Sequence, residues 1–191
     1  MKLAPSLAVL AIFALALSCA QPPKAEADAA RAAVAAAQGD PDIVAYSPDT
    51  LRQATDDLAQ MEQFLKDRRY PEAKAAANQA ASLADSARQE VAGAKLKVKN
   101  DATDLISGAK QQLAALLPTL SAAKRVKHTT LDFAALGTEL AAAQAKLSDA
   151  DAALAAGRFI DARDGATAVK AAFSDIEKRI SDAIQAARKK K

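Results

Sequence analysis

The sequence predicts an all-α protein, built from long antiparallel helical hairpins that form an elongated bundle with coiled-coil-like packing. Alanine supplies about a quarter of the 191 residues, and it is the strongest helix former and a poor strand former. Six glycines and seven prolines are too few to break the chain into many short elements. Leucine recurs every seven residues in two separate segments, which predicts a narrow apolar seam along each of two helices.

Residues 1–18 are predicted to be a lipoprotein signal peptide. Lys2 precedes an apolar run over residues 7–17, which at about 11 residues is too short to span a membrane. Ser18 and then Cys19 follow, and Cys19 is the only cysteine of the chain. This pattern resembles the lipobox of bacterial lipoproteins. It predicts acylation of Cys19 and attachment to a membrane through the lipid.

Other interpretations of Cys19 stay open at this stage. The string Ser18-Cys19-Ala20 also satisfies the small-x-small cleavage rule, which would release a soluble exported protein. An uncleaved anchor and an ordinary free cysteine are the two remaining alternatives. Under the enterobacterial sorting rule, Ala20 rather than Asp after the cysteine favours the outer membrane. We therefore expect a lipid-anchored location in the cell envelope, facing the periplasm.

The elements that follow are marked by prolines. Residues 19–47 are expected to hold the lipid anchor, a tether and a short Ala-rich helix at residues 24–38, which Gly39-Asp40-Pro41 stops. Residues 48–99 are expected to form a first helical hairpin. Its first helix starts with a capping hydroxyl at Ser47, before a proline at the first helical position, and runs to about Arg69.

The next helix opens at Pro71 and is expected to reach Leu117, before Pro118 interrupts it. Asn100-Asp101 is a candidate division within it, because Asp101 and the acid three residues later have capping-box-like spacing. Residues 100–129 are therefore expected to be a connecting helical segment between two hairpins.

Residues 130–191 are expected to form a second hairpin with a basic tail. Thr129 and Asp132 have the spacing of a helix start, and this helix should run to Ala156. Gly157 ends it, and a last helix follows from about Phe159 to the C-terminus.

A shift of 89 positions superposes the two hairpins. It places Leu51, Leu58 and Leu65 on Leu140, Leu147 and Leu154. The turn string Arg69-Tyr70-Pro71-Glu72-Ala73-Lys74 falls on Arg158-Phe159-Ile160-Asp161-Ala162-Arg163, and residue class is retained at five of the six places. Chance similarity between Ala-rich segments is the alternative, but alanine bias does not produce the turn matches. We infer duplication of a helix-turn-helix unit.

Each leucine seam is predicted to pack against smaller residues of the helix that follows it, so that the two axes approach closely. The rings of Tyr70 and Phe159 are expected to fill the turn end of each hairpin, and gripping a sugar or peptide is the alternative use for such paired aromatics. Glu72 and Asp161 fall in a first helical turn, where an anion complements the helix dipole.

Residues 27–88 resemble the DUF4398 family of bacterial envelope lipoproteins, a domain of unknown function. The resemblance rests on an Ala-rich helix followed by a helical hairpin with an aromatic-x-acid-Ala turn, here Tyr70-Pro71-Glu72-Ala73. It implies an all-α fold and an envelope location. It implies no particular activity.

The sequence offers little catalytic chemistry, and we expect no enzyme activity, no metal and no cofactor. His128 is the only histidine and lies in the basic stretch 124–128, where neighbouring cations disfavour a bound metal. Met61 and His128 are a conceivable haem ligand pair, but Met61 occupies a seam position. The sequence contains no glycine-rich phosphate-binding motif, and one histidine in a connector makes a catalytic triad implausible.

The chain ends on the basic residues Arg188, Lys189, Lys190 and Lys191. Cations at a helix C-terminus complement its dipole, which is the simplest interpretation. The more specific interpretation is that these residues contact an anionic envelope polymer or lipid headgroups. A special case is covalent linkage of Lys191 to peptidoglycan. We expect no nucleic-acid partner, because the export signal argues against one.

These features predict a non-enzymatic cell-envelope lipoprotein that acts as a helical spacer or protein-interaction module in the periplasm. Its expected partners are the membrane, through the lipid on Cys19, and an envelope protein or peptidoglycan. The alternative is a carrier or chaperone that binds a lipid, a peptide or a cofactor between its helices. A carrier needs a concave apolar cavity, expected beside Leu58 and Leu147, whereas a spacer does not.

Overall fold

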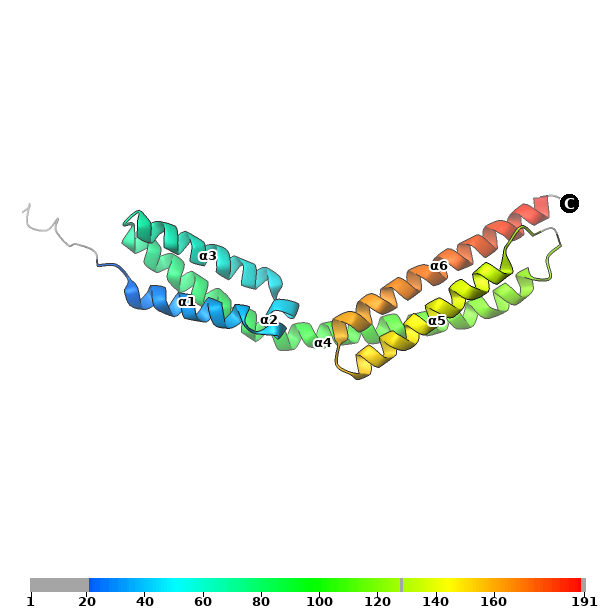
Figure 1. Cartoon of the computed structure of the whole chain (residues 1–191), viewed down its shortest axis with the longest axis horizontal. Coiled ribbons are helices and arrows are strands. Elements are labelled where there is room, and N and C mark those ends of the chain that lie inside the picture. The colour runs from blue at the N-terminus through cyan, green and yellow to red at the C-terminus, as the bar shows by residue number, and fades with distance from the viewer. Residues whose placement is uncertain (1–20, 128, 190–191) are drawn as a thin grey trace, which may run out of the picture. The chain divides into compact units, whose positions relative to one another are not determined.

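The computed structural model describes residues 21–127 and 129–189, and all regular secondary structure in these ranges is helical. The helices are α1 (Lys24–Gln38), α2 (Pro41–Tyr46), α3 (Pro48–Lys66), α4 (Tyr70–Ala123), α5 (Phe133–Ala155) and α6 (Phe159–Lys189) (Figure 1). The all-α prediction is therefore confirmed. Within the same ranges, no helix combines the length and the apolar character that crossing a membrane requires.

The helices group into two compact units, and the boundary between Val91 and Ala92 falls inside α4. The first unit contains α1, α2, α3 and the beginning of α4, and the second contains the rest of α4 with α5 and α6. Each unit has its own cluster of buried apolar residues.

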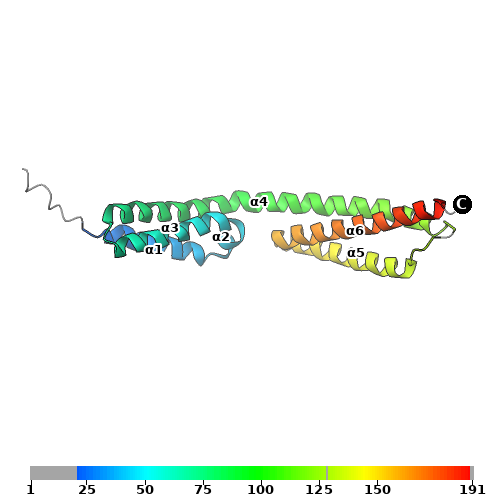
Figure 2. The same ribbon diagram turned by 90° about the horizontal axis from the view of Figure 1, so that it is seen from above.

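In the first unit, α1, α3 and the beginning of α4 lie side by side (Figures 1 and 2). An ion pair joins Arg31 of α1 to Glu62 of α3 at 2.7 Å, and Gln38 of α1 bonds Thr55 of α3 at 3.2 Å. The residue number rises along α1 while its partner's number falls along α3, so these two helices run in opposite directions. The contribution of α4 to the core is made of small residues that are fully buried: Ala73, Ala77, Ala80, Ala84 and Ala87.

In the second unit, α5 and α6 pack along each other and against the rest of α4 (Figure 2). A Cβ atom added at Gly165 of α6 would lie 3.4 Å from the Cβ of Ala150 on α5, so the two helices approach closely there. Large buried side chains come from all three helices of this unit, for example Leu116 of α4, Leu136 of α5 and Phe173 of α6. The second core therefore contains bulky residues as well as alanines.

Two backbone hydrogen bonds in the turn between α3 and α4 terminate α3. The N–H of Arg69 donates to the carbonyl of Phe64 at 2.8 Å, and the N–H of Arg68 donates to the carbonyl of Leu65 at 3.2 Å. These two bonds form the Schellman motif, in which one residue adopts the left-handed conformation. That residue is Arg68, with φ 58°. The motif explains why α3 ends at Lys66 and not at Arg69, where the sequence placed its end.

The turn between α5 and α6 repeats this pattern. The N–H of Arg158 donates to the carbonyl of Ala153 at 2.9 Å, and the N–H of Gly157 donates to the carbonyl of Leu154 at 3.1 Å. Gly157 has φ 78°, the conformation that glycine adopts at least cost. All four positions lie 89 residues after their counterparts in the first turn, which is the shift that superposes the two sequences.

The ion pairs at the two turns also correspond. Arg69 binds Glu72 at 3.1 Å, and Arg158 binds Asp161 at 3.0 Å. Both acids lie in the first turn of their helix, as expected. The rings of Tyr70 and Phe159 are half-buried beside these turns. The same local structure thus occurs twice in the chain.

Two helix starts differ from the expectation. The sequence was expected only to stop α1 at Gly39-Asp40-Pro41, but a short helix, α2, begins there. The side chain of Asp40 caps α2 by accepting a hydrogen bond from the N–H of Asp42 at 2.9 Å. Pro41 occupies the first turn of α2, where the missing N–H costs nothing. At the start of α3, the hydroxyl of Ser47 makes no capping bond. It donates instead to Glu90 on α4 at 2.5 Å.

The long helix α4 contains no division at Asn100-Asp101 and no interruption at Pro118, so the expected connecting segment at residues 100–129 is the continuation of this helix as far as Ala123. Pro118 is exposed, while Leu116 and Leu120 on either side of it are 3% and 7% exposed. Burial of these flanking leucines holds the helix together across the proline, whose lost hydrogen bond faces water.

The other boundaries follow the sequence closely. The bounds of α1 coincide with the expected residues 24–38. The carboxylate of Asp132 accepts hydrogen bonds from the N–H groups of Ala134 and Ala135, both at 3.0 Å, and so caps α5. The sequence placed the start of this helix at Thr129, with Asp132 as the acid of a capping box, so the observed start at Phe133 is later than the predicted one.

Candidate functional site

The predicted site residues are only partly visible in the structure. Cys19, Lys190 and Lys191 lie outside the described residues, and so does His128. Arg188 and Lys189 occupy the last turn of α6 and are exposed. Met61 is fully buried in the first core, as its seam position predicts.

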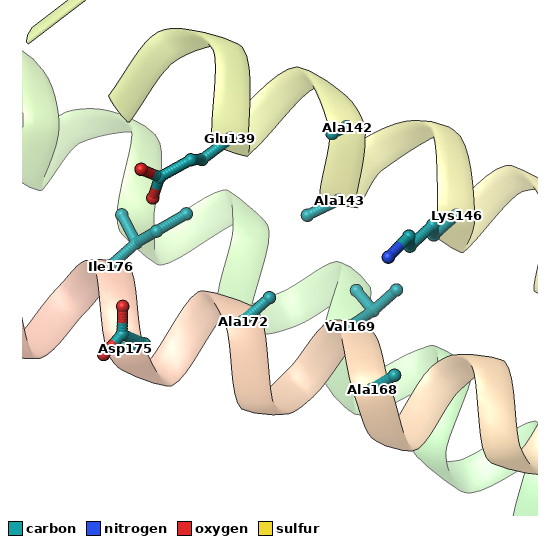
Figure 3. A pocket seen from close by; sticks show the side chains of 9 residues that line it. All are labelled: Glu139, Ala142, Ala143, Lys146, Ala168, Val169, Ala172, Asp175 and Ile176. Carbon is teal, nitrogen blue, oxygen red and sulfur yellow. The ribbon is translucent and has the colours of Figure 1, made fainter. Parts of the chain in front are cut away.

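A shallow groove of about 250 Å³ lies between α5 and α6 (Figure 3). One wall comes from α5 and the other from α6, and small apolar side chains line most of it: Ala142, Ala143, Ala168, Val169, Ala172 and Ile176. Three charged residues complete the lining, Glu139 and Lys146 on α5 and Asp175 on α6 (Figure 3). Sequence reasoning did not find this groove, because it arises where alanines of two helices leave space between them.

Arg179 pairs with the acids at one end of the groove. Its guanidinium donates to Glu139 of α5 at 2.5 Å and lies 3.5 Å from Asp175 of its own helix. The hydrogen bond to Glu139 raises the pKa of Arg179 above its ordinary value, so the guanidinium is charged at every relevant pH. This contact links α5 to α6 across the groove.

A second hollow, of about 460 Å³, continues along the same two helices and shares Lys146 and Ala168 with the groove. Leu147, beside which a carrier cavity was expected, lines neither of the two. Leu58 belongs to the first unit, where it packs half-buried against the core. The charged groups in the lining of the groove are one amine, that of Lys146, and two carboxylates, those of Glu139 and Asp175.

A polar cluster of the first unit joins the start of α3 to α4. The carboxylate of Glu90 accepts hydrogen bonds from the hydroxyl of Ser47 at 2.5 Å and from that of Thr50 at 2.8 Å. These bonds, that from Ser47 first, hold the pKa of Glu90 below its ordinary value. Ser47 is only 4% exposed, so its hydroxyl depends on this carboxylate for a partner.

Two further carboxylates hold α1 against its neighbours. The hydrogen bond from Lys74 on α4 lowers the pKa of Glu26, and the ion pair between them measures 2.6 Å. The hydrogen bond from Arg31 lowers the pKa of Glu62 in the same way. These are ties between helices at the surface and each contributes little to stability. Across residues 21–127 and 129–189, no group of three or more potential metal ligands lies together.

The fold and these surfaces define a helical-bundle protein in which several surface ion pairs join neighbouring helices. Residues 25–105 match the model of the family described as Domain of unknown function (DUF4398). This match confirms the resemblance inferred from residues 27–88 and extends it further along α4. It covers the helices of the first unit and part of the continuation of α4. No curated protein and no solved structure matches the chain.

The cluster around Glu90 predicts a measurable effect on stability. We expect Glu90→Gln to lower the free energy of unfolding by about 1 kcal/mol at neutral pH, because two hydroxyls then donate to a neutral group at a largely exposed site. Chemical denaturation followed by circular dichroism measures this change. Glu177→Gln is the matched control, since Glu177 is exposed on α6.

The pH dependence has a defined sign. The pKa of Glu90 is lowered in the folded state, so its contribution is fully present above the ordinary value of 4.5 and is lost as the pH falls through the lowered pKa. Glu90→Gln should therefore flatten the acid side of the stability curve. Equal acid sensitivity of wild type and variant would show that Glu90 makes no such contribution.

Proposed function

We propose that the protein is a cell-envelope lipoprotein, anchored through Cys19, that acts as a non-enzymatic helical spacer or protein-interaction module in the periplasm. The observation that carries the proposal is the N-terminal pattern: a basic residue, a short apolar run, and a lone cysteine preceded and followed by small residues. Acylation at Cys19 would supply several hydrocarbon chains, which is enough for stable attachment. The residue after Cys19 favours the outer membrane.

The interaction role draws support from the way the two units are built. Each unit fills its own core with buried apolar residues, and the polar contacts between helices lie mainly at the surface. A unit of this kind holds its outer faces in fixed positions, which is what a module for contacting other envelope components requires. Peptidoglycan or an envelope protein is the partner that we propose, with covalent attachment of Lys191 to peptidoglycan as a special case.

The runner-up is a carrier that holds a lipid, a peptide or a cofactor between its helices. The groove between α5 and α6 is the observation that favours it, because alanine and valine side chains line its walls. Its volume of about 250 Å³ lies just below the usual range of ligand sites, which begins at about 300 Å³. The adjoining hollow of about 460 Å³ is large enough, but charged residues such as Asp149, Arg158 and Asp161 line it, whereas a carrier for apolar ligands needs a mostly apolar lining. We therefore rank the carrier second.

The anchor is tested by metabolic labelling with a fatty acid. We expect the wild-type chain to incorporate the label and to fractionate with membranes, whereas Cys19→Ala should do neither, because the thiol is the acceptor of the lipid. Ser18→Ala is the matched control, since it keeps a small residue before the cysteine. Equal labelling of wild type and Cys19→Ala would contradict the lipoprotein assignment.

The module and the carrier are distinguished by what the protein retains. Crosslinking in intact envelopes, followed by capture and mass spectrometry, should yield one recurrent envelope protein or peptidoglycan fragments. Native mass spectrometry of the purified protein should show the mass of the chain alone. A bound small molecule that is displaced by Ala142→Trp, a substitution that fills the groove, would favour the carrier instead.

A further inference from the structure

Five exposed basic residues gather at the end of the second unit where α4 and α6 finish. Lys124, Arg125 and Lys127 follow α4, and Arg188 and Lys189 end α6. Among the residues that the structure describes, none of the five side chains has an ion pair or hydrogen bond. Many other cations of the chain are paired, for example Arg179 with Glu139. We call these five residues the basic tip.

The register between α4 and α6 explains why the two basic segments meet. Gln112 of α4 bonds Ser174 of α6 at 2.9 Å, a separation of 62 positions. The amino group of Lys170 would lie 3.3 Å from a Cβ at Gly108, and this pair is also 62 positions apart. A constant difference means that the two helices run in the same direction in fixed register. The same difference of 62 positions sets residues 124–127 at the level of residues 186–189, and both views show α4 and α6 finishing at the same end of the second unit (Figures 1 and 2).

Acidic residues are absent from both sequence segments that form this end. No Asp or Glu occurs in residues 105–131 or in residues 183–191. The nearest following acid in the connector, Asp132, already accepts two hydrogen bonds as the cap of α5. Nothing within these segments therefore neutralises the basic tip.

Helix dipoles account for only part of the cluster. Arg188 and Lys189 lie in the last turn of α6, where cations are stabilised by the helix dipole. The last turn of α4 contains no basic residue, and Lys124, Arg125 and Lys127 all come after it. The dipole effect falls off within the last turn, so it gives little reason for Lys127 in particular.

The surroundings of the basic tip fit a broad surface and not a pocket. The tip is formed by a chain connection and a helix end, and none of its residues lines the groove or the hollow beside it. Leu117, two turns before Lys124, is 43% exposed and adds an apolar side chain near the cations. Cations together with an exposed leucine match the headgroup region of a bilayer, where charge and apolar contact both contribute.

We propose that the basic tip binds the headgroups of an anionic phospholipid bilayer. The inference goes beyond the proposed function and does not depend on acylation of Cys19, because the contact is made by the other end of the chain's sequence. Each cation near an anionic surface contributes about 1 kcal/mol, so the binding is reversible and weakens as salt screens it.

Energy transfer between the tip and labelled lipid tests the proposal in the full chain. Cys19→Ala removes the natural thiol, and Ala122→Cys, at an exposed position beside the tip, carries a donor dye. The acceptor is a headgroup-labelled lipid in vesicles of phosphatidylcholine, with or without phosphatidylglycerol. Any insertion by the N-terminal apolar run is common to both vesicle types. We expect energy transfer with phosphatidylglycerol vesicles only, and its loss at high salt.

Two triple variants with the same change in net charge locate the contact. Lys124→Gln with Arg125→Gln and Lys127→Gln should weaken binding about 100-fold, from the contribution of three cations. The control, Lys97→Gln with Lys99→Gln and Lys178→Gln, also removes exposed cations and should leave binding nearly unchanged. All six positions are exposed, so the helical circular dichroism of both variants should match that of the unsubstituted chain.

Three results would overturn the proposal. The first is equal energy transfer with and without phosphatidylglycerol. The second is equal weakening in both triple variants, which would reflect net charge and not the basic tip. The third is binding to purified peptidoglycan with no energy transfer to either vesicle, which would assign the tip to a polymer. The outcome at Cys19 is measured separately, so failure of the lipid anchor and failure of this contact are distinguishable.

Discussion

Close approach of helices across buried alanines is the constraint on which the rest of the structure depends. An alanine side chain removes little apolar area from water, so a core built from it is stable only when neighbouring side chains reach across the gap. In the first unit Met61 and Leu51 of α3 reach into the core, and the alanines of α4 accept them. In the second unit α6 carries larger residues, such as Phe173, where α4 has Ala84, which stands 89 positions earlier. The two units therefore share the same repeated turn but pack their cores with side chains of different size.

The features that the sequence predicts well are local. The proline and glycine signals locate α1, and the seven-residue spacing identifies buried residues of α3 and α5, such as Leu51 and Leu140. The repeated turn could be predicted from the sequence because it needs particular residue types at fixed spacing. The backbone conformation of the first turn could not be predicted in the same way. Arg68 adopts a left-handed φ there, which costs a non-glycine residue about 1–2 kcal/mol.

The features that the sequence missed depend on tertiary packing. Pro118 indicates a break, yet burial of Leu116 and Leu120 carries α4 through it. Ser47 has the sequence position of a cap, yet its hydroxyl bonds a carboxylate 43 positions away. The basic tip follows the same rule: two basic segments were visible in the sequence, but only the register of α4 against α6 joins them. Cys19, in contrast, is predicted from sequence alone and stays a prediction.

The central claim, that buried alanines set the distance between the helices, is tested most directly by enlarging one of them. Ala77 is fully buried on α4 and Ala75, two residues before it, is exposed on the same helix. Ala77→Leu should lower the free energy of unfolding by about 1–3 kcal/mol, because the core cannot admit the extra carbons without shifting. Ala75→Leu should change it by less than about 0.5 kcal/mol. Equal stability of the two variants would contradict the claim.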